Sequence, residues 1–184
     1  MAIVERKTGP IFAGPRVRLR PVAESDLPDL MRWDNDPEVT RWAGKRFEND
    51  EDAREWYLPG RNLQRRTFAI DADDVGFIGE IEVINISWRL HSAELRIFIG
   101  EKDLWNRGLG EESVRALMQG LFETTTLNEV FLRVDEHNER AKRCYSKVGF
   151  RAKGRIRLDL DSDKPSSLVL MILTRFTLRR SAMN

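Results

Sequence analysis

The sequence is poor in the residues that build disulfides and metal sites. Its 184 residues include one cysteine, Cys144, and two histidines, His91 and His137. A single cysteine excludes an internal disulfide, and this set of residues lacks the spacing of a zinc site. We therefore expect no bound metal and a reducing, cytoplasmic setting.

An excess of either charge is also missing. The chain has 31 Lys and Arg residues against 30 Asp and Glu residues, a formal net charge of +1. No global field then draws it to nucleic acid or anionic lipid, and any anion site must be local. Glu5, Arg6 and Lys7 interrupt the first residues, and no apolar run of about 18 residues follows. We expect no nucleic-acid partner, signal peptide or membrane span.

Changes of hydrophobic period along the chain predict one α/β (α+β) domain. We assign residues 14–178 to this domain and expect residues 1–13 and 179–184 to be a flexible extension and tail. Alternating and apolar segments predict a single mixed, mostly antiparallel central sheet of about six to seven strands flanked by helices. The predicted strands are 16–22, 66–71, 76–87, 92–100, 129–134, 151–160 and 168–176, the last of them central.

Helical spacing and capping residues predict four helices. They begin after Ser25, after Asn49 or Asp50, near Gly108 and after Asn138, and Gly149 stops the last one.

The strand 76–87 predicts a two-faced ribbon. Phe77, Ile81 and Val83 should share one face, and Glu80 and Glu82 the other. A hairpin turn centred near residues 87–89 would place Glu82 opposite Arg96.

The stretch "LWNRGLGEES" lies where a predicted strand ends and a helix begins. The first amides of a helix lack internal partners and carry the positive end of the helix dipole, which suits a pyrophosphate. Gly108 and Gly110 let an anion approach the backbone closely, and Arg107 adds a positive charge. An ordinary helix start is the alternative. The dinucleotide fingerprint fails because Ser113 replaces its third glycine.

Together, three motifs resemble the GNAT superfamily of N-acetyltransferases. They are a strand ending in "IFIG", the turn "WNRGLG", and "N-x-R-A-x-x-x-Y-x-x-x-G-F" from Asn138 to Phe150. The resemblance runs from about Arg16 to Phe176 and implies the acyl-CoA N-acyltransferase fold with acetyl-CoA as cosubstrate. "NDPEVTRW" and Trp105 look most like the branch that acetylates the N-terminal alanine or serine of ribosomal proteins, with its polyamine- and aminoglycoside-modifying relatives.

The resemblance also implies the residues that hold acetyl-CoA. In the family, the end of the strand before the turn bonds the pantetheine arm, the turn binds the pyrophosphate, and the later helix contributes further contacts. In this sequence those roles fall on Phe98, Ile99, Gly100, Trp105, Asn106, Arg107, Gly108, Leu109, Gly110, Asn138 and Arg143. Trp105 departs from the glutamine or arginine usual at its position and removes one side-chain donor.

Two residues are candidates for catalysis. An amine with a pKa of about 10.4 must lose its proton, and the family places an acidic residue on the strand that carries Glu94, which is the candidate base. Tyr145 matches the family's tyrosine, which protonates the leaving thiolate. Proton transfer from a phenol to a thiolate is uphill by only about 2 kcal/mol. Cys144, inside a predicted helix, fits a buried apolar residue rather than a nucleophile.

We therefore predict an N-acetyltransferase in which an amine attacks acetyl-CoA directly. The alternatives are a non-catalytic acyl-CoA-binding or sensing domain and a pure interaction module. Glu80, Glu82 and Trp42 are the candidate acceptor-binding residues, and a protein N-terminus, a polyamine, an aminoglycoside or an amino-acid-like amine all remain open. Relatives often form dimers, so a homodimer is also expected.

Overall fold

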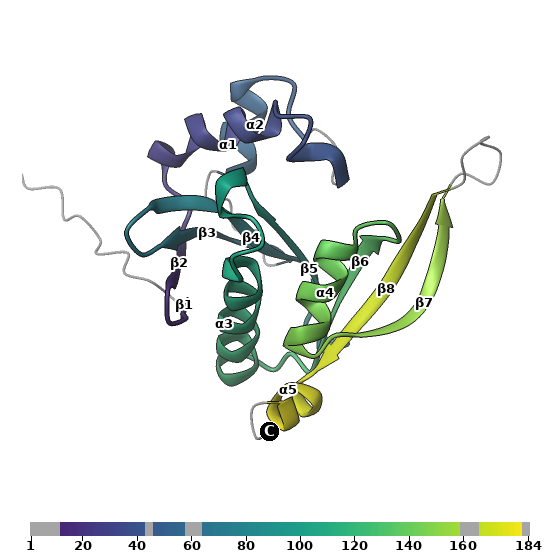
Figure 1. Cartoon of the computed structure of the whole chain (residues 1–184). Coiled ribbons are helices and arrows are strands. Elements are labelled where there is room, and N and C mark those ends of the chain that lie inside the picture. Colours follow the sequence, from purple (N-terminus) through teal and green to yellow (C-terminus); the bar gives the residue numbers. More distant parts are fainter. Residues whose placement is uncertain (1–11, 43–45, 58–63, 159–165, 182–184) are drawn as a thin grey trace, which may run out of the picture.

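A computed structural model describes residues 12–42, 46–57, 64–158 and 166–181. One eight-stranded sheet has the order β1-β2-β3-β4-β5-β6-β8-β7 (Figure 1). The strands are β1 (Phe12–Ala13), β2 (Val17–Pro21), β3 (Arg66–Ala72), β4 (Gly76–Ser87), β5 (Ser92–Ile99), β6 (Glu129–Asp135), β7 (Arg151–Leu158) and β8 (Ser166–Thr174). The sheet is mixed and mostly antiparallel, as predicted, and β1 is the strand that the sequence did not predict.

Helices flank the sheet and join its strands. In the described residues they are α1 (Leu27–Asp34), α2 (Asp50–Tyr57), α3 (Leu109–Thr124), α4 (Glu139–Val148) and α5 (Arg175–Ser181). The Asn49 side chain accepts from the amides at the start of α2, and Gly149 ends α4 in the left-handed region, as predicted. Ser25 is not a cap, because a short 3-10 turn (Glu24–Asp26) precedes α1.

Strand pairing confirms most of the predicted arrangement. Glu82 lies opposite Arg96, and β8 is a central strand between β6 and β7. The predicted face of Phe77 is wrong. A register shift between Ile70 and Asp71, opposite Ile78, reverses the alternation of β4, so Phe77 packs beside Trp33 while Ile78 enters the main core.

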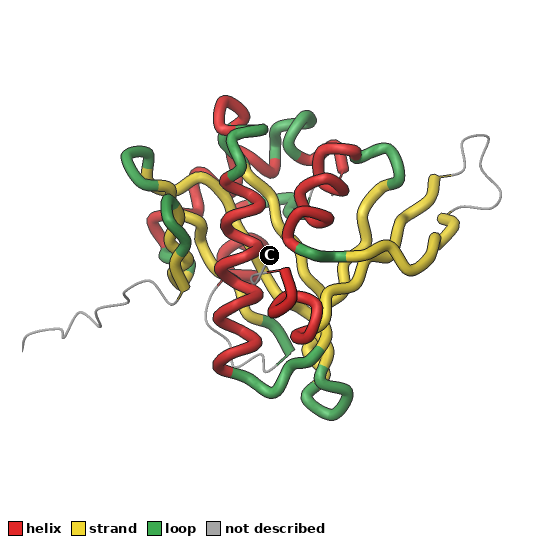
Figure 2. Tube along the Cα trace, turned by 60° about the horizontal axis from the view of Figure 1, so that its bottom comes forward, coloured by secondary structure: helices red, strands yellow, loops and turns green. Residues whose placement is uncertain are grey.

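Two helical layers cover opposite faces of the sheet. α3 and α4 pack on one face over the main core, and in Figure 2 the long α3 runs along the strands. α1 and α2 cover part of the other face, where Leu27, Leu30 and Trp33 form a smaller core with Phe77 and Phe98. The main core thus lies on the α3 and α4 side of the sheet, and the other face is only partly covered.

The β5–β6 pair is parallel and short. Only Ser92–Glu94 of β5 pair with Glu129–Phe131 of β6. Beyond Glu94, β5 continues to Ile99 without β6 as a partner, and β6 continues to Asp135 paired only with β8. A gap therefore opens between β5 and β6 toward the carboxyl end of both strands.

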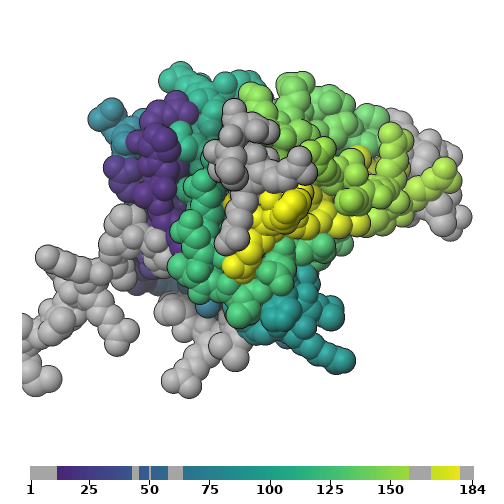
Figure 3. All heavy atoms as spheres, turned by 90° about the horizontal axis from the view of Figure 1, so that it is seen from below, coloured from purple at the N-terminus to yellow at the C-terminus, as the bar shows by residue number. Residues whose placement is uncertain are grey.

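Both ends of the described chain carry secondary structure that the sequence did not predict. Phe12 belongs to β1, and its ring lies 5.7 Å from that of Phe68. At the other end, α5 extends to Ser181 and lies beside α3, as Figure 3 shows from below. Secondary structure therefore extends beyond both ends of the predicted domain 14–178, and residues 1–11 and 182–184 lie outside the described residues. No described helix combines the length and apolarity needed to cross a membrane.

Candidate active site

A cavity of about 360 Å³ lies between the end of β5, the start of α3 and the face of α4. Most of the predicted site residues line it: Trp42, Phe98, Ile99, Trp105, Asn106, Gly108, Leu109, Gly110, Asn138, Arg143 and Tyr145. Glu80, Glu82, Glu94, Gly100 and Arg107 do not. The structure thus brings the predicted cofactor residues together and separates them from the three predicted carboxylates.

The turn before α3 presents a run of free backbone amides. Asn106 and Gly108 have positive φ values of 64° and 83°, and Gly108 is the N-cap of α3. Within the described part of the chain, the amides of residues 106–111 have no hydrogen-bond acceptor. Consecutive free amides at a helix N-terminus form a site for phosphate oxygens.

Positive side chains surround this amide run, and one of them was missed. Arg143 lines the cavity, and Arg107 is exposed beside it. Arg16 donates from Nη2 to the Arg107 carbonyl at 3.3 Å and pairs with Glu112, which neutralises one acidic group of the first helical turn. Arg16 directly precedes β2, about 90 residues before the turn, so local sequence gave no sign of this contact.

Only alternate residues of β5 point their backbone N–H and C=O groups into the gap. The Gly100 amide donates to the Ile78 carbonyl on β4 at 2.8 Å. Because backbone groups of successive strand residues point to opposite edges, Phe98 also faces β4, whereas Ile97 and Ile99 face the gap. Only Ile99 of the three predicted pantetheine contacts therefore offers its backbone there. Ile97 was missed, although strand alternation alone would have indicated it.

Trp105 occupies part of this edge. Its indole Nε1 donates to the Ile99 carbonyl at 2.7 Å, and the Arg140 guanidinium stacks 3.8 Å from its ring centre. Burial lowers the pKa of Arg140 from its ordinary value. Trp105 thus fixes the end of β5 and leaves the Ile97 backbone and the Ile99 amide as the free groups of the gap.

Gly100 has a packing role instead of the predicted cofactor contact. A Cβ on this residue would lie 2.0 Å from Cδ2 of Trp33, which is 1% exposed. Only glycine lets the buried indole of α1 pack against the chain at the end of β5.

The helix α4 presents Asn138 and Tyr145 to the cavity. Asn138 caps α4 by accepting from the Ala141 amide at 3.1 Å, which leaves its side-chain NH₂ group for a ligand. Tyr145 is buried against Phe150, and its hydroxyl has no hydrogen-bond partner among the residues described. Burial and the neighbouring Cys144 raise the pKa of Tyr145, so the phenol keeps its proton. Tyr145 therefore places a protonated, unpaired hydroxyl beside the cavity.

Cys144 is unsuited to covalent chemistry. It also lines the cavity, but burial and then Glu111 raise the pKa of its thiol to about 12. The reactive thiolate is therefore scarce at neutral pH. His91 and His137 do not line the cavity and cannot activate it.

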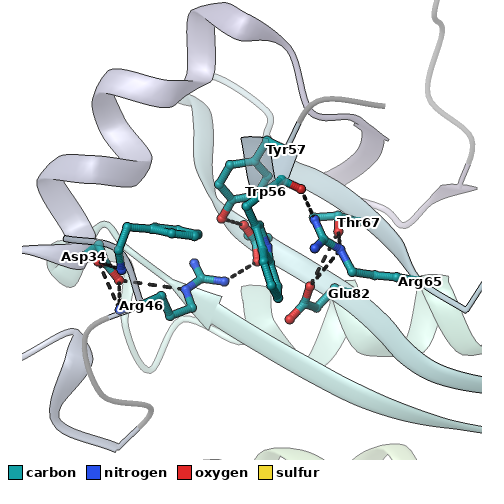
Figure 4. Close-up of polar contacts among 9 residues, drawn as sticks. Asp34, Arg46, Trp56, Tyr57, Arg65, Thr67 and Glu82 are labelled. Carbon is teal, nitrogen blue, oxygen red and sulfur yellow. Dashed lines mark hydrogen bonds and ion pairs between the residues drawn. The ribbon is translucent and has the colours of Figure 1, made fainter. Parts of the chain in front are cut away.

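Glu80 and Glu82 are closed off by side chains from α2 and the flanking segments (Figure 4). Glu80 accepts from Arg46 at 2.8 Å and from the Tyr57 hydroxyl. Glu82 accepts from Thr67 at 3.5 Å and lies 3.8 Å from Arg65. Both are 2% exposed or less, so they do not form an open acidic mouth. The predicted acceptor role of these two carboxylates has no support in the geometry.

Glu82 makes stability depend on pH. Burial, and then the Glu80 carboxylate, raise its pKa from 4.5 to about 7. Between pH 4.5 and about pH 7 the folded state then binds more protons than the unfolded state. The stability that the protonated Glu82 contributes is therefore fully present below pH 4.5 and is lost as the pH rises to about 7. We expect Glu82→Gln to remove up to about 3 kcal/mol of the difference in unfolding free energy between pH 5 and pH 8. Urea unfolding at pH 5 and pH 8 measures this difference, and Glu123→Gln, an exposed change, is the control and should leave it unchanged. The same difference in Glu82→Gln as in the parent protein would contradict the prediction.

Glu94 is held at the point where β5 and β6 separate. Arg133 of β6 donates to it from Nε at 3.1 Å and from Nη2 at 2.8 and 3.0 Å. Asn85, in the left-handed region at a bulge of β4, donates to Oε2 at 2.9 Å. Two oxygens engaged in this way, on a residue 3% exposed, leave no free site for an amine proton. The geometry therefore opposes direct proton transfer to Glu94.

Comparisons with known proteins agree with this geometry. Residues 16–151 match the family model described as an acetyltransferase (GNAT) domain. Spermidine N(1)-acetyltransferase of Escherichia coli K12 is 26% identical over 144 residues, which cover 76% of this chain and 75% of that protein. Aminoglycoside N(6')-acetyltransferase type 1 of Klebsiella pneumoniae is 25% identical over 178 residues, which cover 90% and 86%.

Solved structures share the fold. A spermidine N-acetyltransferase from Vibrio cholerae in complex with CoA and spermine has a TM-score of 0.80 at 19% identity, covering 89% of this chain and 98% of its own. RimJ of Mycobacterium smegmatis in complex with CoA-disulfide has a TM-score of 0.75 at 19% identity, covering 95% and 92%.

The described residues contain no group of three or more His, Cys, Asp or Glu side chains placed to hold a metal ion. The family match covers most of the chain, and it includes the turn before α3 and all of α4. This chain belongs to the GNAT family of acetyltransferases and is an N-acetyltransferase that uses acetyl-CoA.

Proposed function

We propose that the protein transfers the acetyl group to a primary amine of a small molecule by direct attack in a ternary complex. The observation that carries this proposal is the run of free amides at residues 106–111, inside a cavity that also contains the unpaired Tyr145 hydroxyl. A cytoplasmic setting and a homodimer remain predictions.

The cavity residues fit the pyrophosphate and the pantetheine arm of acetyl-CoA. The free amides, with Arg107 and Arg143, suit the pyrophosphate. The free backbone groups of Ile97 and the Ile99 amide suit the pantetheine amides as an added strand would. The Asn138 NH₂ group supplies one further donor. When bound, acetyl-CoA supplies the activated acetyl group.

Tyr145 is the proposed general acid. It would give its proton to the sulfur as the bond between sulfur and the acetyl carbon breaks. The nitrogen that has bonded to that carbon then loses its extra proton to water, and the tyrosinate regains a proton from water. Burial raises the pKa of the phenol and makes it a weaker acid. The difference between this pKa and that of the departing thiol governs the transfer.

Glu94 acts on the reaction indirectly in this proposal. Its oxygens are engaged by Arg133 and Asn85, so it holds the Arg133 guanidinium beside the gap instead of taking the amine proton. The neutral fraction of the amine is then the nucleophile. This differs from the catalytic role that the resemblance implied for Glu94.

Binding of acetyl-CoA tests the proposal directly. We expect heat on calorimetric titration and a raised melting temperature with acetyl-CoA. Arg107→Glu should weaken binding about tenfold or more, because it reverses a charge beside the phosphate site. Arg89→Glu, an exposed change in the β4–β5 turn, should leave affinity unchanged. No heat and no melting shift at millimolar acetyl-CoA would refute the proposed function.

A further inference from the structure

Two exposed arginines flank the gap on the open face of the sheet. Arg96 of β5 lies opposite Glu82, and Arg133 of β6 is two residues from Phe131, the partner of Glu94. Paired and alternate strand residues share a face, so both arginines lie on the face away from α3 and α4. Arg96 therefore lies on the β5 side of the gap and Arg133 on the β6 side.

These two arginines share a single carboxylate. Arg133 bonds Glu94 Oε1 at 2.8 Å, and Arg96 Nε lies 3.8 Å from the same oxygen. The side chain of Arg133 is 39% exposed and that of Arg96 is 49% exposed, whereas that of Glu94 is 4% exposed. Arg96 makes no hydrogen bond to any described residue, and the Nη1 group of Arg133 has no partner there either. The exposed surface at this point therefore carries net positive charge and free guanidinium donors.

The two carboxylates of β4 on this face already have arginine partners. Arg46 pairs with Glu80, and Arg65 lies beside Glu82. Asp135, two residues beyond Arg133 on β6, accepts a hydrogen bond from the His137 amide at 2.8 Å. A polyamine approaching from this face would meet two guanidinium groups and be repelled.

We propose that the acceptor is a small amine that also carries a carboxylate, as an amino acid does, and that Arg96 and Arg133 bind that carboxylate. This inference rests on the proposed function, since it concerns the amine that enters the same gap. Planar guanidinium groups suit carboxylate oxygens through paired charge-assisted hydrogen bonds. Glu94, which Asn85 also holds, fixes Arg133 beforehand, and the loosely paired Arg96 completes the site.

A paired acceptor panel tests the inference. The full-length protein and acetyl-CoA are mixed with each of the standard L-amino acids, with the matching carboxamides and with spermidine, and release of free thiol is followed. We expect the best carboxylate acceptor to exceed its own carboxamide at least about tenfold in kcat/KM. The comparison is stringent, because the carboxamide has the less basic amine and hence more of the neutral nucleophile.

A matched pair of variants locates the recognition. Arg96→Gln should reduce the carboxylate-to-carboxamide ratio about tenfold or more, and Arg89→Gln should leave it unchanged. Arg96 suits this test because it is half exposed and only loosely paired, so its replacement leaves no buried charge alone.

Each outcome decides the inference. Preference for carboxylate acceptors that Arg96→Gln removes supports it. Turnover of spermidine or carboxamides equal to or above that of carboxylates overturns it, as does an unchanged ratio in Arg96→Gln or failure of every carboxylate acceptor. In those cases bound acetyl-CoA still supports the proposed function, whereas absence of acetyl-CoA binding refutes the proposed function itself.

Discussion

Replacing Tyr145 with phenylalanine is expected to lower kcat by about 10²-fold or more while leaving the affinity for acetyl-CoA unchanged. Only the hydroxyl is lost, and that hydroxyl has no hydrogen bond to a described residue. Folding should be unaffected, because the ring keeps its contact with Phe150, 5.9 Å away between centres. The effect should therefore appear in the chemical step alone.

Thiol release with a saturating acceptor measures kcat, and calorimetry measures acetyl-CoA binding in the same variant. Cys144→Ala is the matched control, since it alters the adjacent residue of the same cavity. Its thiol has a pKa of about 12, so we expect kcat to stay within about threefold. If Tyr145→Phe retained the parent kcat, the tyrosine would be a packing residue and another group would protonate the sulfur.

Local sequence was sufficient to predict the two helix starts that line the cavity. Gly108 and Asn138 mark helix starts, and the amides and cap that they create depend only on residues within a few positions. Their order along the chain then identified the family. The cavity assembles from these local features because β5, α3 and α4 follow one another closely in sequence.

Contacts between distant segments could not be predicted in the same way. Glu94 was a plausible base until Arg133, 39 residues away, was found to hold it. Glu80 and Glu82 looked like an open acidic face, but Arg46 and Arg65 come from segments whose packing no periodicity specifies. Alternation predicts which face a side chain takes, and it does not predict what covers that face.

The bulge in β4 shows how one residue can alter such a prediction. Alternation placed Phe77 with Ile81, and the extra residue moved it to the face of Trp33 and Phe98. That change builds the smaller core beneath α1, which carries the segment with Val39 and Trp42 to the cavity. The acceptor side of the site thus depends on a feature without a clear sequence signal.

Gly100→Ala is expected to destabilise the fold by about 2–3 kcal/mol, because it overpacks the smaller core. The added Cβ would lie 2.0, 2.3 and 2.4 Å from three ring atoms of Trp33. The indole cannot swing aside, since it is buried and contacts Phe77 and Phe98 at ring-centre distances of 4.9 and 6.0 Å. Backbone movement at the end of β5 is the remaining way to relieve the clash.

That movement links stability to function. Gly100 follows Ile99, whose amide faces the gap, and its own amide is anchored to Ile78 of β4 at 2.8 Å. Urea unfolding should show a lower midpoint with an unchanged slope, and acetyl-CoA affinity should fall with it. Gly154→Ala, in a strand position with no atom within 4 Å of the added Cβ, is the control and should change stability by less than about 0.5 kcal/mol. Equal stability of Gly100→Ala and Gly154→Ala would contradict the prediction. It would show that α1 can move away from the end of β5, so that Trp33 does not fix the acceptor side of the cavity.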